Sequence, residues 1–188
     1  MFMETILSIF LGIGLAASVG FRVFLPLFAL SLAAYFNVWE LNESWEWIGS
    51  TTAVITLGIA TLVEIVAYYI PIVDNALDTI AIPLATIAGT AVMVSTVADL
   101  SPVITWALAI IAGGGTAAAV KSSAGVTRAG STVSTAGFGN PIVSTIETGS
   151  SIVMSIVSIF LPILAILFVL FIFYIIYKIY KKIRPSSS

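Results

Sequence analysis

Charged side chains stand in or beside apolar sequence at seven positions, and each needs a chemical reason. They are Arg22, Glu64, Asp74, Asp78, Lys121, Arg128 and Glu147. A charge at the centre of a bilayer costs about 2.5–3.5 kcal/mol on insertion scales, so each group needs an ion-pair partner, a water-filled cavity or an interfacial position. Basic groups beside a helix N-terminus favour an anionic ligand. Glu64, the deepest of the set by sequence, is a candidate carrier of a coupling proton.

A polar stretch from Lys121 to Ser151 lies between two long apolar segments, although about half of its residues are Ser, Thr or Gly. Lipid tolerates such a composition only where it is buried in protein or lines a wet cavity. Asn140 and Pro141 form a helix-start signal, with Asn140 as the N-cap and Pro141 at the first helical position. Glu147 follows, where a negative charge suits the helix dipole. Asn140 therefore joins the seven charged residues as a candidate member of a substrate or ion pathway.

Other chemistries lack the residues that they need. The chain has no Cys and no His, which excludes thiol nucleophiles, disulfides, Cys/His zinc sites and histidine-based catalysis. Asp74 and Asp78 share a helix face at a spacing of four and could hold a divalent cation, but a solvated helix start explains them more simply. We therefore expect no catalytic residue, no metal, no cofactor and no enzymatic activity. No basic footprint for nucleic acid is present either.

Composition predicts an all-α transmembrane helical bundle in a single domain. Hydrophobic residues make up 60% of the chain, charged residues 9%, and the mean hydropathy is +1.16. Such a chain cannot build a soluble surface, and several apolar runs reach or approach the roughly 20 residues that span a bilayer. About seven membrane segments are predicted, at residues 5–20, 21–36, 48–70, 79–98, 103–120, 122–138 and 142–177. The alternative is six spans, with residues 21–36 or 122–138 re-entrant.

The distribution of basic residues predicts the orientation. Residues 178–188 form a basic tail, which the positive-inside rule places in the cytoplasm. Counting back through seven spans puts the N-terminus outside and places Arg22, Lys121 and Arg128 at inner turns. The first apolar run is expected to be a retained span. The expected location is a cell membrane, the inner membrane of a bacterium.

A faint internal repeat is visible. Residues 14–19 resemble residues 115–120, and each run precedes a basic residue, Arg22 or Lys121. The repeat would give a 3+1+3 arrangement of spans with two parallel units, as in some transporters. Chance similarity is the alternative, since Ala, Gly and Val are common in this chain.

The charges, the polar segment and the helix breakers predict a transporter or channel for a small solute or ion. Glu64 is expected to pair with Arg22 or Arg128, with the polar segment packed on residues 48–70 as one wall of a pocket. Membrane lipid and a small anionic solute or ion are the expected partners. Association into a homo-oligomer is a further alternative. The alternatives are a non-catalytic membrane scaffold or accessory subunit and, third, a lipid-acting membrane enzyme.

Three motifs resemble an uncharacterised bacterial membrane family known as domain of unknown function 4126. They are a Gly-x-Arg run with a following Leu-Pro within residues 14–26, a Glu…Pro-x-x-Asp-x-x-x-Asp pattern within 64–78, and a Gly-x-Gly-Asn-Pro-x-x-Ser-x-x-Glu pattern within 137–147. The motifs occur in the family's order and cover most of the chain. The resemblance implies a multi-span helical membrane protein and implies no activity.

The chain departs from the family's pattern at several charged positions. Tyr68 and Tyr69 stand where the family usually has Asp-Lys, and Thr148 replaces the second member of an acidic pair. Ala124 stands where the family tends to place a lysine, and Lys121 lies one turn earlier. We therefore expect an ion pair typical of the family to be absent or rerouted.

Overall fold

The computed structural model describes residues 2–97 and 100–183, and every regular element in these ranges is helical. The elements are α1 (Phe2–Phe21), α2 (Phe24–Tyr35), the 3₁₀ helix η1 (Glu43–Gly49), α3 (Thr51–Ala67), α4 (Pro71–Thr96), α5 (Pro102–Leu108), the π-helical η2 (Ala109–Gly114), α6 (Gly115–Thr135), α7 (Asn140–Phe160) and α8 (Pro162–Ile183).

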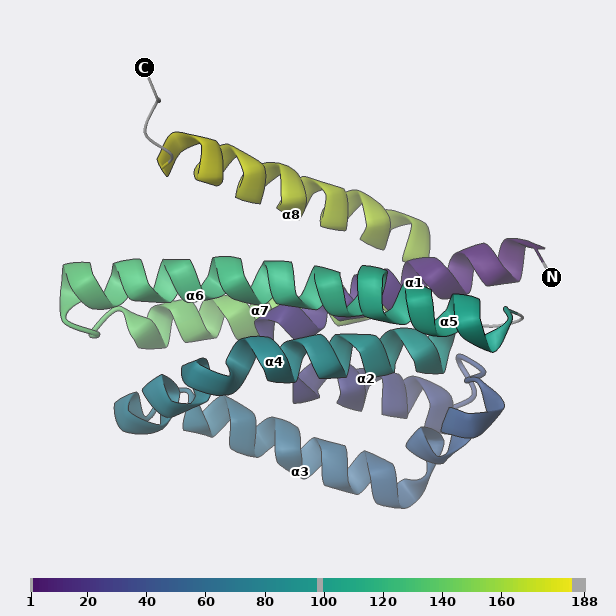
Figure 1. Cartoon of the computed structure of the whole chain (residues 1–188). Helices are drawn as coiled ribbons and strands as arrows, with labels where there is room; N and C mark the ends of the chain where they lie inside the picture. The colour runs from purple at the N-terminus through teal and green to yellow at the C-terminus, as the bar shows by residue number, and fades with distance from the viewer. Residues whose placement is uncertain (1, 98–99, 184–188) are drawn as a thin grey trace.

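Successive helices run back and forth between two ends of the bundle (Figure 1). α3, α6 and α8 finish toward one end, which we call the basic end, because Lys178 and Lys181 lie there on α8, and α1 runs toward the same end but stops partway along the bundle. η1 and the start of α5 lie at the opposite end, which we call the acidic end after Glu40 and Glu43. α1 is the central helix and packs against α4, α6, α7 and α8.

Within the residues that the structure describes, five helices are long and apolar enough to cross a membrane, and a sixth span results if η1 and α3, bent by 65°, count as one. α2 has 12 residues, about 18 Å at 1.5 Å per residue, which is short of the roughly 30 Å hydrocarbon core. The prediction of a multi-pass helical membrane protein is thus confirmed at this level. The count of seven spans is not confirmed.

The predicted boundary between segments 103–120 and 122–138 is wrong. One continuous helix runs through α5, η2 and α6 over 34 residues, from Pro102 to Thr135. Ser and Thr side chains within it donate hydrogen bonds to backbone carbonyls one turn earlier. Ser122 donates to Ala118 and Thr127 donates to Ser123. Because these bonds lie within the helix, Ser and Thr do not interrupt it. Gly113 and Gly114 widen it into a π turn instead.

The predicted long segment 142–177 is divided in two. α7 ends at Phe160, Leu161 takes φ −139° and ψ 62°, and α8 begins at Pro162. Proline cannot continue a helix without losing a hydrogen bond, so the chain turns here. Figure 1 shows α8 running back at an angle to the other helices, and only 11% of its spanning window is buried.

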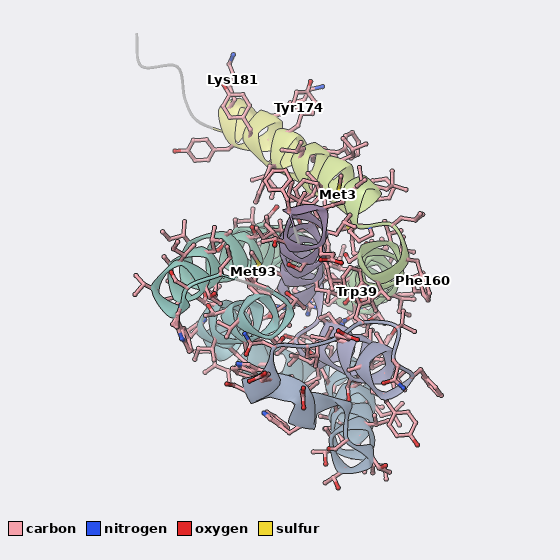
Figure 2. The ribbon with its side chains drawn as sticks, turned by 90° about the vertical axis from the view of Figure 1, so that its right-hand side faces the viewer. Met3, Trp39, Met93, Phe160, Tyr174 and Lys181 are labelled. Atoms are coloured by element: carbon pink, nitrogen blue, oxygen red, sulfur yellow. The ribbon has the colours of Figure 1, made fainter. Side chains whose placement is uncertain are left out.

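A loop closes the bundle beside this turn. Trp39 donates its indole N–H to the carbonyl of Ile159 at 2.8 Å. Figure 2 shows Trp39 near Phe160, whereas Tyr174 and Lys181 on α8 project away from the remaining helices. Of the two ends of α8, the one that follows α7 is therefore the better anchored.

The internal repeat is not confirmed. Residues 14–19 lie near the end of α1, which stops at Phe21. Residues 115–120 open α6, which continues to Thr135. The two runs therefore occupy different positions in their helices.

Small residues allow close approach of helices, as is usual inside membranes. A Cβ added at Gly113 would lie 2.5 Å from the carbonyl oxygen of Gly89 in α4 and 2.6 Å from the Cβ of Met93. Between α1 and α7, the Ser18 hydroxyl lies 2.9 Å from that of Ser151 and 2.8 Å from that of Ser155. The first contact brings η2 against α4, and the second joins α1 to α7.

We expect Gly113→Ala to lower the free energy of unfolding by about 1–3 kcal/mol through overpacking. Gly115→Ala is the matched control, because nothing lies within 4 Å of a Cβ there, and Ala stabilises a helix relative to Gly by up to about 1 kcal/mol. Denaturant titration of the purified variants in detergent micelles measures both. Equal effects at the two positions would contradict the close contact of α4 and η2.

We also expect the two ends of the bundle to lie on opposite sides of the membrane. The chain has no cysteine, so single-cysteine variants at the exposed residues Glu43 and Ser134 report cleanly. A membrane-impermeant maleimide added to sealed, oriented vesicles should label one variant, and the other only after permeabilisation. Labelling of both from one side would contradict this arrangement.

Candidate functional site

A buried ionic cluster lies in the half of the bundle nearer the basic end, where α1, α2, α3, α4, α6 and α7 meet. Its side chains come from the break between α1 and α2, from the turn between α3 and α4, and from α6 and α7. They are Arg22, Glu64, Tyr68, Asp74, Asp78, Lys121, Arg128, Asn140, Ser144 and Glu147. All except Asp78 and Asn140 are buried.

Arg22 stands between α1 and α2 and is 0% exposed. Its Nε donates to the Thr148 hydroxyl at 3.0 Å, and Nη2 donates to the carbonyl and the hydroxyl of Ser144 at 2.9 and 3.0 Å. Nη1 lies 3.2 Å from Glu147 Oε2 as an ion pair, without the geometry of a hydrogen bond. Arg22 therefore fixes the end of α1 to α7.

Glu64 on α3 caps α2. Its Oε1 accepts from the backbone N–H of Val23 at 2.7 Å, and Oε2 accepts from that of Phe24 at 2.9 Å. The first amides of a helix lack partners within it, and a negative charge there suits the helix dipole. The expected ion pair of Glu64 with Arg22 or Arg128 is wrong, because within residues 2–97 and 100–183 Glu64 has no cation within 4.0 Å.

Arg128 on α6 holds three carboxylates. Its Nε donates to Glu147 Oε1 at 2.9 Å and Nη2 donates to Oε2 of the same residue. Nη1 donates to Asp74 Oδ1 in the first turn of α4, and Asp78 Oδ2 lies 3.9 Å away. Pro71 starts α4 at the turn after α3 and so places Asp74 and Asp78 on the face toward α6. The arginine thus connects α6 to both α4 and α7.

Tyr68 lies among the three cations of the cluster. Its ring centroid is 4.1 Å from Arg22 Cζ and 4.4 Å from Arg128 Cζ. Lys121 Nζ donates to the Tyr68 hydroxyl at 3.2 Å and lies 5.1 Å from the ring centroid. Cations are attracted to the face of an aromatic ring within about 6 Å of its centroid. Tyr68 thereby joins α1, α3 and α6 electrostatically.

Asn140 extends the cluster from the start of α7. The predicted helix start is confirmed, but Gly139 holds the N-cap position and Asn140 belongs to the helix. The Asn140 amide instead donates to Asp74 Oδ2 at 3.4 Å and to the Thr132 hydroxyl at 3.1 Å. A side chain read as a helix cap is therefore used between helices.

All eight residues singled out from the sequence lie in or beside this cluster. Six form one connected network of side-chain contacts through arginine or carboxylate, namely Arg22, Asp74, Asp78, Arg128, Asn140 and Glu147. Lys121 joins through Tyr68, and Glu64 joins through the amides that follow Arg22. The polar segment meets residues 48–70 through side chains at Tyr68, whereas the helix packing of α6 is against α1, α4 and α7.

Sequence reasoning missed two members of the cluster. Tyr68 follows Glu64 by four residues and Ser144 precedes Glu147 by three, so each shares a helical face with a residue already singled out. The Ser144 hydroxyl accepts hydrogen bonds from Nη2 of both Arg22 and Arg128, at 3.0 and 3.1 Å. Their helical spacing from Glu64 and Glu147 was the signal in the sequence that could have identified both residues as members of the cluster.

The described carboxylates are not arranged for metal binding. In the part of the chain that the structure describes, no group of three or more His, Cys, Asp or Glu residues could hold a metal ion. Asp74 and Asp78 both face Arg128, so a guanidinium occupies the place that a cation between them would take.

Two cavities adjoin the cluster and a third lies at the acidic end. A cavity of 440 Å³ between α2, α3 and α4 is lined by Glu64 and Tyr68 among apolar residues. A smaller one of 180 Å³ reaches Glu147 between α6, α7 and α8. At the acidic end a polar cavity of 740 Å³ includes Glu40 and Glu43.

The fold and the cluster define a polytopic helical membrane protein with a compensated ionic centre at a helix break. The chain belongs to the family described as domain of unknown function DUF4126, whose model it matches over residues 9–182. This match confirms the resemblance seen in the three motifs. No curated protein and no solved structure matches the chain.

We expect Arg128→Met to lower the free energy of unfolding by about 3–5 kcal/mol, because it leaves Asp74 and Glu147 buried without their cation. Lys178→Met, at an exposed site on α8, should change it by less than about 0.5 kcal/mol. Denaturant titration in detergent measures both. A loss at Arg128 as small as that at Lys178 would show that the cluster is not a stabilising centre.

Proposed function

We propose that this protein is a transporter or channel for a small charged solute or ion. The observation that carries the proposal is the buried ionic cluster at the break between α1 and α2. α4, α6 and α7, which contribute side chains to the cluster, belong to candidate membrane spans.

The first argument is energetic. The cluster contains Arg22, Lys121 and Arg128 together with four carboxylates. Replacing a buried ion pair by apolar side chains is often neutral or stabilising, so packing alone does not require seven charges. Ionisable groups within membrane segments mark substrate and ion pathways.

The second argument is the discontinuous helix. Transporters often bind substrates where a membrane helix is broken, using the exposed backbone groups of the half-helices. Here the first amides of α2 face Glu64 inside the bundle. Replacing or displacing this carboxylate would free two donors, which gives the site two electrostatic states.

The cluster offers an argument for an anionic solute and another for a cationic solute. The anionic solute expected from the basic residues loses support at Arg22 and Arg128, whose charges carboxylates already offset. Lys121 still supports an anionic solute, because its buried ammonium donates its hydrogen bond to the neutral hydroxyl of Tyr68. A cationic solute is supported by Glu64, which lines a cavity and has no ion-pair partner among the described residues.

The proposed orientation places the basic end in the cytoplasm, with the C-terminal tail inside, and the proposed location is a bacterial inner membrane. Arg22, Lys121 and Arg128 lie in the half of the bundle nearer that end and Lys178 at the end itself, as the positive-inside rule requires. Membrane lipid is the proposed surrounding partner. A homo-oligomer remains a proposal, for which α8 offers an exposed apolar surface.

A non-catalytic scaffold is the second candidate, and the internal compensation of the cluster favours it. Arg128 with Asp74 and Glu147 would serve this role as a connection between three helices. The lipid-acting enzyme stays third, because Asp74 and Asp78 are directed at Arg128 rather than at a free site.

We expect the protein reconstituted in liposomes to pass at least one small charged solute, in a panel of inorganic cations, inorganic anions and organic cations. Glu64→Gln should slow that flux about tenfold, equivalent to about 1.4 kcal/mol in barrier height. Glu46→Gln, an exposed residue of η1, should not change it. Tracer efflux and ion-sensitive dyes measure the rates.

The scaffold hypothesis gives a different result. Liposomes tight to the whole panel would contradict transport. So would a variant combining Arg128→Met with Asp74→Leu and Glu147→Leu that folds and restores every cellular phenotype of a deletion strain, because the cluster would then serve packing alone.

A further inference from the structure

We propose that the cavity between α2, α3 and α4 binds a lipophilic organic cation against the carboxylate of Glu64. This inference rests on the proposed function and names a substrate class for it. The chemical class is an amine, quaternary ammonium or phosphonium ion that carries bulky apolar groups.

The shape and lining of the cavity suit such a ligand. Its volume of 440 Å³ falls in the range of roughly 300–1,000 Å³ that is usual for small-molecule sites. Its walls are formed mainly by aliphatic side chains of α3 and α4 and by Phe24, and its polar members are Thr56, Glu64 and Tyr68. An apolar site with a few converging polar groups is the usual form of a binding site for a small organic molecule.

Glu64 supplies the only charge among the described lining residues. The other carboxylates of the cluster, Asp74, Asp78 and Glu147, each lie within 4.0 Å of an arginine. Glu64 is instead held by the backbone amides of Val23 and Phe24. Each carboxylate oxygen can accept about two hydrogen bonds, so both retain capacity toward a ligand.

The three buried cations are kept away from this cavity. None of Arg22, Lys121 and Arg128 lines it, whereas Tyr68 lines it and contacts all three. A positively charged ligand therefore meets the carboxylate first, with the tyrosine between it and the cations. An anionic ligand in the same cavity would face Glu64.

The surroundings of the cavity favour a lipophilic cation over a hydrated metal ion. Ile59 and Val63 line the cavity and are 57% and 62% exposed on α3, so the site adjoins the surface that meets lipid. A small inorganic cation would lose its water among aliphatic walls at a large cost. A cation with apolar substituents partitions into the bilayer and can reach the site from there.

The test is equilibrium binding of radiolabelled tetraphenylphosphonium to the full-length protein in nanodiscs of zwitterionic lipid. We expect saturable binding at one site per chain, weakened at least about tenfold by Glu64→Gln, which corresponds to about 1.4 kcal/mol. Ala60→Phe keeps the carboxylate, places a ring in the cavity and should also abolish binding. Glu46→Gln is the control, because Glu46 is an exposed residue of η1 that lies outside the ionic cluster and outside the cavity lining, and it should bind as the wild type does.

A neutral ligand of similar shape, tetraphenylmethane, separates charge recognition from partitioning into lipid. Its retention should not depend on Glu64. Non-saturable binding of the cation, or saturable binding that neither Glu64→Gln nor Ala60→Phe weakens in monodisperse protein, would overturn the proposal. Should Glu64→Gln not fold, Ala60→Phe decides alone.

The same preparation separates this inference from the proposed function. Tetraphenylphosphonium that binds at Glu64 but is never transported leaves the site intact and contradicts transport of this ligand class. Flux of another solute in liposomes, without tetraphenylphosphonium binding, overturns the inference and leaves the transporter in place.

Discussion

The cost of placing charge away from water is the constraint on which this structure depends. Arg22, Lys121 and Arg128 are all buried, and an unpaired charge at such a position would be expensive. The protein meets the cost by bringing carboxylates from α4 and α7 to the arginines and by placing Tyr68 among all three cations. These contacts connect the ends of α1 and α3 to α4, α6 and α7.

The same constraint explains the behaviour of the polar segment. Ser and Thr residues of α6 return their hydroxyls to the helix backbone, and serines of α7 meet Ser18 of α1. Polar groups that would be costly in lipid are thereby satisfied within the bundle. A stretch rich in Ser, Thr and Gly consequently continues as helix in α6 and packs closely on α1 in α7.

The sequence was sufficient to predict the class of fold and the charged members of the cluster, because both depend on composition and on charge in apolar surroundings. Charged residues as far apart as Arg22 and Glu147 had to converge, since each needed compensation. Pro71 and Pro162 stand at the starts of α4 and α8, where the missing N–H of proline costs no hydrogen bond within the helix.

The partners within the cluster were not predictable in the same way. Glu64 has two ways to meet its charge, an arginine or the free amides of a helix start, and only the position of α2 relative to α3 decides between them. Gly113 and Gly114 lie against α4, and the helix continues through them as a π turn. The sequence shows which charges need a partner, whereas the packing of the helices determines which group becomes that partner.

The position of Glu147 along α7 has an electrical consequence. Glu147 lies roughly two-thirds of the way along this helix from Phe160 toward Asn140. In the proposed orientation, a solute that reaches the cluster from outside has therefore crossed roughly two-thirds of the transmembrane field. Each unit of positive charge brought there gains about 1.5 kcal/mol per 100 mV of inside-negative potential. The resting potential of the cell would thus hold cations at this site and oppose the entry of anions.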